Sequence, residues 1–477
     1  MVRLKKMFIL FAIFAVLVTF FLLIYSDIVC FDKYLQKVEI DDIDDLMRID
    51  GGNHTKWIED FFEKRKEFVK PPSVEQYPSL KIIRIPSASK EDTKYLDEFF
   101  NARKQLNLSA EGRYLYLNEP TPEKRSKKFK ILIWKFGQML ERRHLYYFHQ
   151  VRHEPFANCS VNNCVLDYEE SSAADADAVV VLLHRLNGIA SLPNVTRPAW
   201  QRWVFLNDES PYNVFNLGHA KWTDLDGLFN WSMTFKAESD VPVPYGRVIP
   251  RASPVLLEDS LDFQSKFSGL VPHAERKRRD VLAAVLMSNC GKDNDRLKYL
   301  KELQEHIKVD FYGRCSPDPQ LKSGCPGSYG DDCPKLEEYL FYLAFENSAC
   351  DEYITEKTFS HAYRKGNIPI IMGNRAELLN LLLPPNSFIN AYDFESPKAL
   401  AEKMLYINST MESSYLEYQD WRRTLEVVNE HGYFNAPSLH YCRLCEALNY
   451  NDEKPKVYGL EDLAKFLNPA TNCQKHT

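Results

Sequence analysis

The sequence predicts an α/β protein with two α/β units in tandem, facing each other across a cleft. From residue 129 onward, short apolar runs alternate with helical stretches, a pattern typical of parallel sheets. The pattern starts again after the polar link at residues 274–280. Ligands of open parallel sheets bind at the carboxyl ends of the strands, so we expect the chemistry at these edges.

The N-terminus predicts a single transmembrane helix ahead of both units. Residues 7–25 carry no charge and span about 28 Å as a helix, close to one hydrocarbon core. Arg3, Lys5 and Lys6 precede this run, so the positive-inside rule places residues 1–6 in the cytosol and the body across the membrane. A cleaved signal peptide is the alternative, although the run is longer than such a peptide needs and no A-x-A-like site follows it.

The rest of the chain has features of an oxidising, glycosylating compartment. Sequons for N-glycosylation occur at Asn53, Asn107, Asn158, Asn194, Asn230 and Asn408. The eleven cysteines include the close pairs Cys159/Cys164, Cys325/Cys333 and Cys442/Cys445, which favour disulfides. Metal binding by Cys442 and Cys445 is the alternative, and His440 is the one adjacent further ligand. Because eleven is odd, one thiol is left over, and we expect it to be Cys30.

Composition and charge restrict the function. The chain has 60 basic and 66 acidic residues, so it lacks the basic excess of a nucleic-acid binder. Residues 26–128 are charged with scattered apolar residues and prolines, which predicts a partly helical, partly flexible stem. A length of 477 residues leaves ample chain for two large units beyond this stem.

The elements follow in order from the apolar runs. The first unit has predicted strands at 130–136, 178–183 and 203–206. The second has predicted strands at 281–287, 309–312, 339–345 and 368–372, with helices at 295–306 and 355–365, the latter capped by Gly366.

Polar residues at the predicted strand ends are the candidates for chemistry. Asn347 follows one strand, and Glu356 and Lys357 open the next helix, where free N–H groups favour an anion such as a phosphate. A lysine in that first turn makes sense beside a bound anion, since the helix dipole disfavours a cation there. The alternative is that these are solvated helix residues and a turn cap.

Two further strand ends carry suitable groups. Ser288 and Asn289 follow the 281–287 strand, and Arg296 near the next helix start suits a bidentate phosphate contact. Glu209 follows the 203–206 strand, where a rigidly held carboxylate suits a general base. A surface ion pair and a turn cap are the alternative roles of Arg296 and Glu209.

Other motifs point away from several chemistries. Asp175-x-Asp177 and Asp224-x-Asp226 match a metal-binding D-x-D pattern, but the spacing is common and Asp177 precedes a strand. Neither a glycine-rich phosphate loop nor a G-x-S-x-G hydrolase elbow occurs.

Several blocks resemble the α-1,3-fucosyltransferase family. They are WVFLNDESP at 203–211, TFKAESDVPVPYG at 234–246, and above all FYLAFENSACDEYITEK at 341–357 followed by IPIIMG at 368–373. The resemblance covers about residues 129–462. It implies a GT-B fold of two Rossmann-like domains, an acceptor domain at 129–275 and a GDP-fucose domain with a disulfide-rich tail at 276–477.

The resemblance also implies a reaction and a set of roles. L-fucose would pass from GDP-β-L-fucose, with inversion, to the 3-hydroxyl of N-acetylglucosamine, with Glu209 as the general base. The implied donor-binding residues are Tyr245, Ser288, Asn289, Arg296, Tyr342, Asn347, Tyr353, Glu356 and Lys357, and Gln138 would contact the acceptor. No cofactor is implied as required, with stimulation by Mn²⁺ left open. The layout implies a type II Golgi membrane protein, with dimerisation through the anchor or stem left open.

The acceptor is the least determined part of this prediction. Leu183–Leu186 departs from the pattern of many relatives, and Lys236–Ala237 departs from that of Lewis-type members. FYGRC at 311–315, with Cys325 and Cys333, looks more like invertebrate and plant enzymes that modify the innermost N-acetylglucosamine of N-glycans. A Lewis-type enzyme acting on antennae or glycolipid is the alternative. A catalytically silent glycan-binding relative, a receptor module and a transferase of another sugar nucleotide are the other classes.

Overall fold

The computed structural model divides the chain into two compact units, Met1–Pro72 and Ser73–Thr477, and the residues it describes all belong to the second. They are 90–144, 155–156, 159–216, 220–255, 257–258, 260–290, 295–326, 332–373, 375–434, 436, 438–452, 454 and 456–474. The predicted cytosolic tail (1–6), transmembrane helix (7–25), Cys30, Asn53 and Asn158 lie outside them. Within the described ranges, no helix is both long and apolar enough to cross a membrane.

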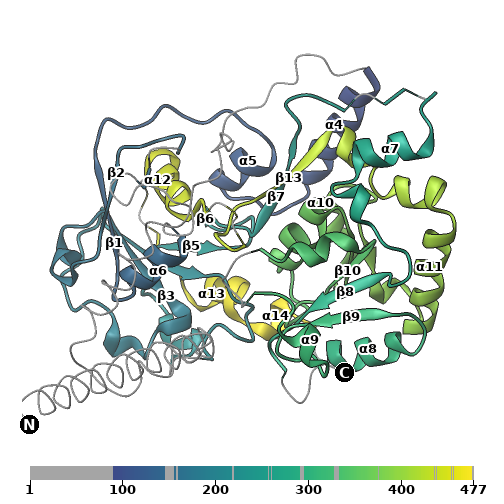
Figure 1. The fold of residues 1–477 in the computed structure, drawn as a ribbon. Coiled ribbons are helices and arrows are strands. Elements are labelled where there is room, and N and C mark those ends of the chain that lie inside the picture. Colours follow the sequence, from purple (N-terminus) through teal and green to yellow (C-terminus); the bar gives the residue numbers. More distant parts are fainter. Residues whose placement is uncertain are drawn as a thin grey trace, which may run out of the picture. The chain divides into compact units, whose positions relative to one another are not determined.

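The first sheet contains six parallel strands (Figure 1). Its spatial order is β2 (Cys164–Asp167), β1 (Phe129–Ile133), β3 (Ala178–Leu182), β4 (Arg202–Asn207), β5 (Trp231–Thr234) and β6 (Val241–Pro242). Every residue of β3 and β4 is buried, as expected of central parallel strands covered on both faces.

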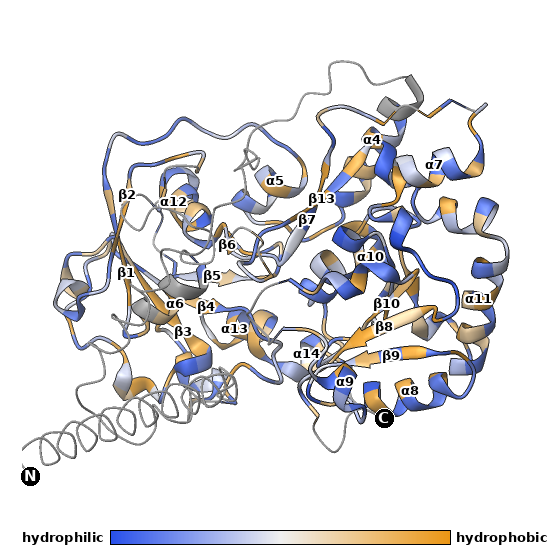
Figure 2. Cartoon of the chain, in the orientation of Figure 1, coloured by the Kyte–Doolittle hydropathy of each residue, from blue (hydrophilic) through white to orange (hydrophobic). Residues whose placement is uncertain are grey.

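The second sheet contains five parallel strands. Its order is β12 (Ile389–Asn390), β11 (Ile368–Ile371), β10 (Phe341–Ala344), β8 (Ala283–Leu286) and β9 (Val309–Tyr312). Figure 2 shows hydrophobic residues concentrated in the strands of this sheet, with hydrophilic residues on the helices around it. The predicted α/β class with parallel sheets is confirmed, and the sheets fall on either side of the predicted domain boundary at 275/276.

Helices and one small sheet complete the body. A two-stranded antiparallel sheet pairs β7 (Gly246–Pro250) with β13 (Leu425–Asn429). The α-helices are α4 (Lys90–Arg103), α5 (Ala110–Tyr116), α6 (Gly137–His144), α7 (Phe263–Leu270), α8 (Asp295–Gln304), α9 (Pro319–Lys322), α10 (Ala376–Leu382), α11 (Pro397–Ser409), α12 (His440–Tyr450), α13 (Leu460–Leu467) and α14 (Pro469–Asn472).

The C-terminal segment returns to the first sheet. Leu444 and Leu448 of α12 pack in one core cluster with β1, β3 and β4, and Leu463 and Phe466 of α13 pack in another with the same strands. Figure 1 shows α12 and α13, in yellow, beside the strands of the first sheet. Residues 440–467 therefore pack with the first sheet, although the predicted second domain (276–477) includes them.

In the part of the chain that the structure describes, ten cysteines form five disulfides. Cys325 bonds to Cys333, as the close pair predicts, but Cys159 bonds to Cys442 and Cys164 to Cys445. Cys442 and Cys445 lie one turn apart on α12, so both sulfurs face β2 and the loop before it instead of each other. This bonding excludes the alternative of a metal site at these two cysteines. The other disulfides are Cys290–Cys315 and Cys350–Cys473.

The described end of the predicted stem packs into the body. Arg103 of α4 is 1% exposed and donates hydrogen bonds to the carbonyl oxygens of Leu381 (3.0 Å) and Val248 (3.2 Å). Phe99 and Leu115 belong to a core cluster that also contains residues of the second sheet. The stem expected over 26–128 therefore includes two helices that are part of the folded body.

Candidate active site

The loops after β4 and β10 bring Glu209 and Asn347 together. The Asn207 side chain stabilises the first loop, because its Nδ2 donates to the Glu209 carbonyl oxygen (2.9 Å) and its Oδ1 accepts from the Glu209 N–H (3.2 Å). The Glu209 carboxylate, which is half-buried, then accepts from Asn347 Nδ2 (3.4 Å) and from the Tyr353 hydroxyl (3.3 Å). A carboxylate at the end of a first-sheet strand is thus held by two residues from the second sheet.

A second contact joins the same two loops. Ser210 Oγ lies 3.0 Å from Ser348 Oγ, and both serines are buried. Asn213 Nδ2 donates to Ser210 Oγ at 2.9 Å and lies 3.3 Å from Ser348 Oγ. These contacts fix the relative position of the two strand ends that carry the predicted base and the predicted donor site.

Lys357 lies at the centre of a buried charge cluster. Its Nζ is 3.0 Å from Glu346 Oε2 and 2.9 Å from Glu356 Oε1, and it donates to Thr355 Oγ1 at 2.9 Å. Burial lowers the pKa of Lys357, but the two carboxylates outweigh burial and leave the pKa above its ordinary value, so the amine is protonated. The cluster supplies a fixed cation near Glu209.

The two acids of this cluster differ in their pKa. Burial raises the pKa of Glu346, an effect that Lys357 partly offsets. Burial also acts to raise the pKa of Glu356, but Lys357 and His361 lower it to about 2. Glu356 is therefore an ionised acceptor, suited to the hydroxyl groups of a ribose.

Arg296 contributes a second cation at the start of α8. It is 6% exposed, and its guanidinium donates to the carbonyl oxygens of Phe345 (3.1 Å) and Asn289 (3.0 Å). Burial lowers its pKa, and Glu346 is the largest effect in the opposite direction. The contact with Asn289 connects the loop after β8 to the loop after β10.

Tyrosines surround the cluster. Burial raises the pKa of Tyr353 and Tyr245, and Glu209 raises both further, so both remain hydrogen-bond donors. The Tyr342 side chain on β10 is fully buried, and burial raises the pKa of its hydroxyl, so the hydroxyl stays protonated.

The predicted site residues fall into several groups. Asn347 and Tyr353 contact Glu209, and Tyr245 interacts with its charge. Four others form the adjoining charge cluster: Arg296, Tyr342, Glu356 and Lys357. Ser288 and Asn289 lie at the edge of this group, where the Asn289 carbonyl oxygen meets Arg296. The side chain of Gln138, on α6, lies outside the described part of the chain. Their individual roles stay predictions.

Three residues that the sequence did not single out belong to the cluster. Glu346 and Thr355 hold each other, with Thr355 N and Oγ1 both 2.8 Å from Glu346 Oε1. His361 is 2% exposed, and burial lowers its pKa to about 4, so it is neutral at pH 7. Glu346 could have been predicted from the sequence, because it directly precedes Asn347 at the same strand end.

The predicted helix at 355–365 differs from an α-helix. It begins as a π-helix at Lys357–Ala362 and ends as a 3₁₀ turn at Tyr363–Lys365, followed by Gly366 with a φ of +74°. π-helical turns are rare and occur mostly at functional sites. The expected anion site at an α-helical N-terminus is therefore replaced by side-chain groups on an irregular turn.

Neither D-x-D pair lies at this site. Asp177 precedes β3 at its amino end, where it pairs with Lys127 and accepts from the Lys130 N–H at 2.8 Å. Asp224 accepts from the Lys221 N–H at 2.8 Å and caps a 3₁₀ turn. Both pairs have structural roles in the described residues.

Of the sequons, Asn230 has an environment that excludes a glycan. Its side chain accepts from the Trp203 N–H at 2.8 Å and donates to the Lys456 carbonyl oxygen at 2.8 Å, and it is 6% exposed. Asn107 and Asn194 are exposed, and Asn408 is half-buried. The structure therefore argues against the prediction of a glycan at Asn230.

Comparison with known proteins identifies the family. Residues 276–466 match the family described as glycosyltransferase family 10 (fucosyltransferase) C-term, and residues 126–246 match fucosyltransferase, N-terminal. The 3-galactosyl-N-acetylglucosaminide 4-alpha-L-fucosyltransferase FUT3 of Bos taurus is 36% identical over 310 residues, which are 64% of this chain and 74% of the relative. The chain belongs to glycosyltransferase family 10, the fucosyltransferases. The predicted α-1,3-fucosyltransferase family and enzyme class are thereby confirmed.

Other relatives agree with this assignment. Alpha-(1,3)-fucosyltransferase 7 of Rattus norvegicus is 33% identical over 64% of this chain and 72% of its own length. The 4-galactosyl-N-acetylglucosaminide 3-alpha-L-fucosyltransferase FUT5 of Homo sapiens is 35% identical over 62% of this chain and 71% of its own length. A crystal structure of an alpha1,3-fucosyltransferase with GDP-fucose covers 74% of this chain and 96% of its own, at 17% identity and a TM-score of 0.41, a likeness too weak to carry an argument.

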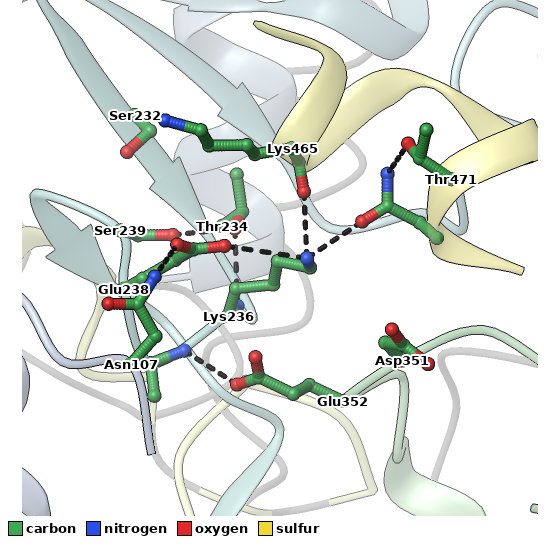
Figure 3. A network of polar contacts seen from close by, with 12 residues as sticks. Asn107, Ser232, Thr234, Lys236, Glu238, Ser239, Asp351, Glu352, Lys465 and Thr471 are labelled. Atoms are coloured by element: carbon green, nitrogen blue, oxygen red, sulfur yellow. Dashed lines mark hydrogen bonds and ion pairs between the residues drawn. The ribbon is translucent and has the colours of Figure 1, made fainter. Parts of the chain in front are cut away.

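One departure of this fucosyltransferase from Lewis-type members has a structural role. Lys236 is 6% exposed, and its Nζ donates to the Lys465 carbonyl oxygen and to Asn472 Oδ1, both at 2.7 Å (Figure 3). It also lies 3.5 Å from Glu238 Oε1. Lys236 thus joins the loop after β5 to α13 and α14.

Proposed function

We propose that this chain is an inverting α-1,3-fucosyltransferase that moves L-fucose from GDP-β-L-fucose to the 3-hydroxyl of N-acetylglucosamine on N-glycans. The observation that carries the proposal is the Glu209 carboxylate, which accepts hydrogen bonds from Asn347 and Tyr353. These two residues belong to the same segment that carries Lys357 and that Arg296 contacts at Phe345. A single base beside an anion-binding cluster suits an inverting displacement, in which acceptor and leaving group lie on opposite faces of the sugar.

The proposed reaction balances at named groups. The acceptor oxygen forms a bond to fucose C1 as the bond from C1 to the GDP oxygen breaks, and Glu209 takes the hydroxyl proton. GDP leaves with its electron pair and gains negative charge, which Lys357 and Arg296 stabilise.

The donor is proposed from the chemistry of the cluster. Two buried cations suit a diphosphate, the ionised Glu356 suits a ribose diol, and the Tyr342 hydroxyl offers a further hydrogen bond. The family resemblance assigns the same residues to GDP-fucose. The proposal includes no required cofactor, and an assay with and without Mn²⁺ tests whether the ion stimulates transfer.

The architecture and location belong to the same proposal. The body contains two parallel sheets packed with helices, and strand ends of both sheets meet at one site. This arrangement suits the GT-B fold. The uncharged run at 7–25 and the disulfides suit a type II protein of the Golgi membrane with a lumenal body. Microscopy of the tagged full-length chain with a Golgi marker, and protease protection of its C-terminus, test the location and orientation.

The innermost N-acetylglucosamine is the proposed acceptor, and antennal lactosamine is the second candidate. The purified full-length chain is incubated with GDP-fucose and either a truncated N-glycopeptide or N-acetyllactosamine, and the products are read by mass. Fucose on the innermost sugar supports the proposal, whereas fucose on lactosamine alone identifies a Lewis-type enzyme. Binding of GDP without transfer to either acceptor would favour the silent relative, although Glu209, Arg296 and Lys357 are all present.

A further inference from the structure

Two buried histidines lie close to Asp208, the residue before the candidate base. His144 at the end of α6, Asp208 after β4 and His440 at the start of α12 are each 1% exposed. One ligand atom from each lies within 4.8 Å of the other two. The three residues come from segments that are far apart in the sequence, and the arrangement has no part in the proposed transfer reaction.

The two imidazoles are oriented by one shared hydroxyl. Ser438 Oγ lies 2.8 Å from His144 Nδ1 and 3.0 Å from His440 Nδ1, and the ring centroids of these histidines are 3.9 Å apart. A hydroxyl oxygen has two lone pairs, so it can accept from both Nδ1–H groups at once. Both rings then have a neutral Nε2 with a lone pair, the state in which histidine binds a metal.

The carboxylate is supported in the same way. Asp208 Oδ2 lies 3.3 Å from His431 Nε2, and the His431 ring stacks on Tyr245 with a centroid distance of 3.7 Å. The contact between Asp208 and His431 is therefore an ion-pair distance between two buried groups next to the cluster.

We propose that His144, Asp208 and His440 bind one Zn²⁺ ion. Two imidazole nitrogens and one carboxylate oxygen form a donor set that zinc accepts, with water in the fourth position. Tetrahedral zinc requires ligand atoms about 3.3 Å apart, so the side chains close slightly around the ion.

The proposed role of the ion is structural. It would join α6, the loop after β4 and α12, and Asp208 directly precedes Glu209 on that loop. The ligands are buried, whereas Glu209 is half-buried and turns toward Asn347 and Tyr353. Zinc is therefore placed to hold the loop that carries the base, and not to contact the substrate.

Metal content tests this proposal independently of transfer. The full-length chain, purified in mild detergent and dialysed against metal-free buffer, should retain about one zinc per chain by mass spectrometry of the elements. The double variant His144→Ala/His440→Ala should retain less than about a tenth of that amount. The matched control His306→Ala, at an exposed histidine, should retain the wild-type amount.

Two further measurements keep the proposal falsifiable if the double variant does not fold. Ser438→Ala should keep the ligands but lower zinc affinity about 10- to 100-fold, as loss of an outer hydrogen-bonding partner does. Zinc added to the chelator-treated wild type should raise its melting temperature. If the wild type holds less than about 0.1 zinc per chain and its melting temperature does not respond to added Zn²⁺, the proposed zinc site is wrong. If the double variant holds as much zinc as the wild type, His144 and His440 are not the ligands.

Discussion

The Tyr353 hydroxyl lies 3.3 Å from Glu209 Oε2, although 144 residues separate the two in the sequence. Tyr353 follows a strand of the second sheet and Glu209 a strand of the first, so the contact joins the proposed donor and acceptor sides. Burial, and then the charge of Glu209, raise the pKa of Tyr353, which keeps the hydroxyl protonated as a donor. The proposed base is thus positioned by the part of the chain that is proposed to bind the nucleotide.

Tyr353→Phe should lower turnover about fivefold, because one hydrogen bond of about 1 kcal/mol that holds the base is lost. The phenyl ring keeps its packing against Phe235, so the melting temperature should change little. Steady-state kinetics and thermal unfolding check this, with Tyr418→Phe as the control. Unchanged turnover would show that this contact does not position Glu209.

Lys357→Ala should weaken GDP binding about 10- to 100-fold, because a charge-assisted contact to phosphate is lost and two carboxylates are left without their cation. Calorimetric titration with GDP measures this. Lys398→Ala is the matched control, since Lys398 is exposed on α11 and pairs with Glu402 in one helical turn. GDP affinity that is equal in the two variants would remove Lys357 from the diphosphate site.

Glu352 predicts a pH dependence of stability. Burial raises its pKa to about 7 although Lys236 and the Ala237 N–H oppose the shift. A raised carboxyl pKa contributes stability below the unfolded value of about 4.5, and this contribution is lost as the pH rises through 7. Glu352→Gln should therefore show a smaller loss of unfolding free energy between pH 5 and pH 8, by about 1–3 kcal/mol.

Denaturant unfolding of wild type and Glu352→Gln at both pH values measures that difference. The glutamine oxygen can still accept from the Ala237 N–H, which is 2.9 Å from Glu352 Oε2. Asp452→Asn, at an exposed carboxylate, serves as the control. Parallel pH profiles for wild type and Glu352→Gln would contradict the raised pKa.

Among the disulfides, the two that attach α12 should contribute most to the stability of the folded protein. Cys159–Cys442 closes a loop with a sequence separation of 283 residues, whereas Cys325–Cys333 closes one of 8 residues. In the chain-entropy account longer loops give more stabilisation, with about 2–5 kcal/mol for a native bond. Replacing all four of Cys159, Cys164, Cys442 and Cys445 with alanine should lower the melting temperature more than Cys325→Ala/Cys333→Ala does, and the reverse order would contradict the chain-entropy account.

The strand ends could be predicted from the sequence because buried parallel strands are continuous apolar runs. β9 has the predicted limits, and β4 extends the prediction by one residue at each end. Glu209, Asn347 and Arg296 follow or flank such runs, so their convergence at one edge was predictable. The sequence therefore predicted those parts of the site whose positions follow from the order of the strands in the sheets.

The remaining features depend on tertiary contacts that local patterns do not encode. The apolar face of α12 contains no information about which sheet it covers, and its return to the first sheet determines the partners of Cys442 and Cys445. The π-helical turn at Lys357 was expected as an α-helix because backbone hydrogen-bond type is not visible in periodicity. The inward position of Lys236 depends on α13 and α14, more than 200 residues later.

The most direct test of the central claim is the Glu209→Gln variant. Its kcat for fucose transfer and its Kd for GDP are measured beside wild type and the exposed control Glu275→Gln. We expect kcat to fall about 10²- to 10⁴-fold, since a positioned base contributes that much, while the Kd for GDP and the melting temperature stay at the wild-type values. Turnover within a few-fold of wild type would show that Glu209 is not the base.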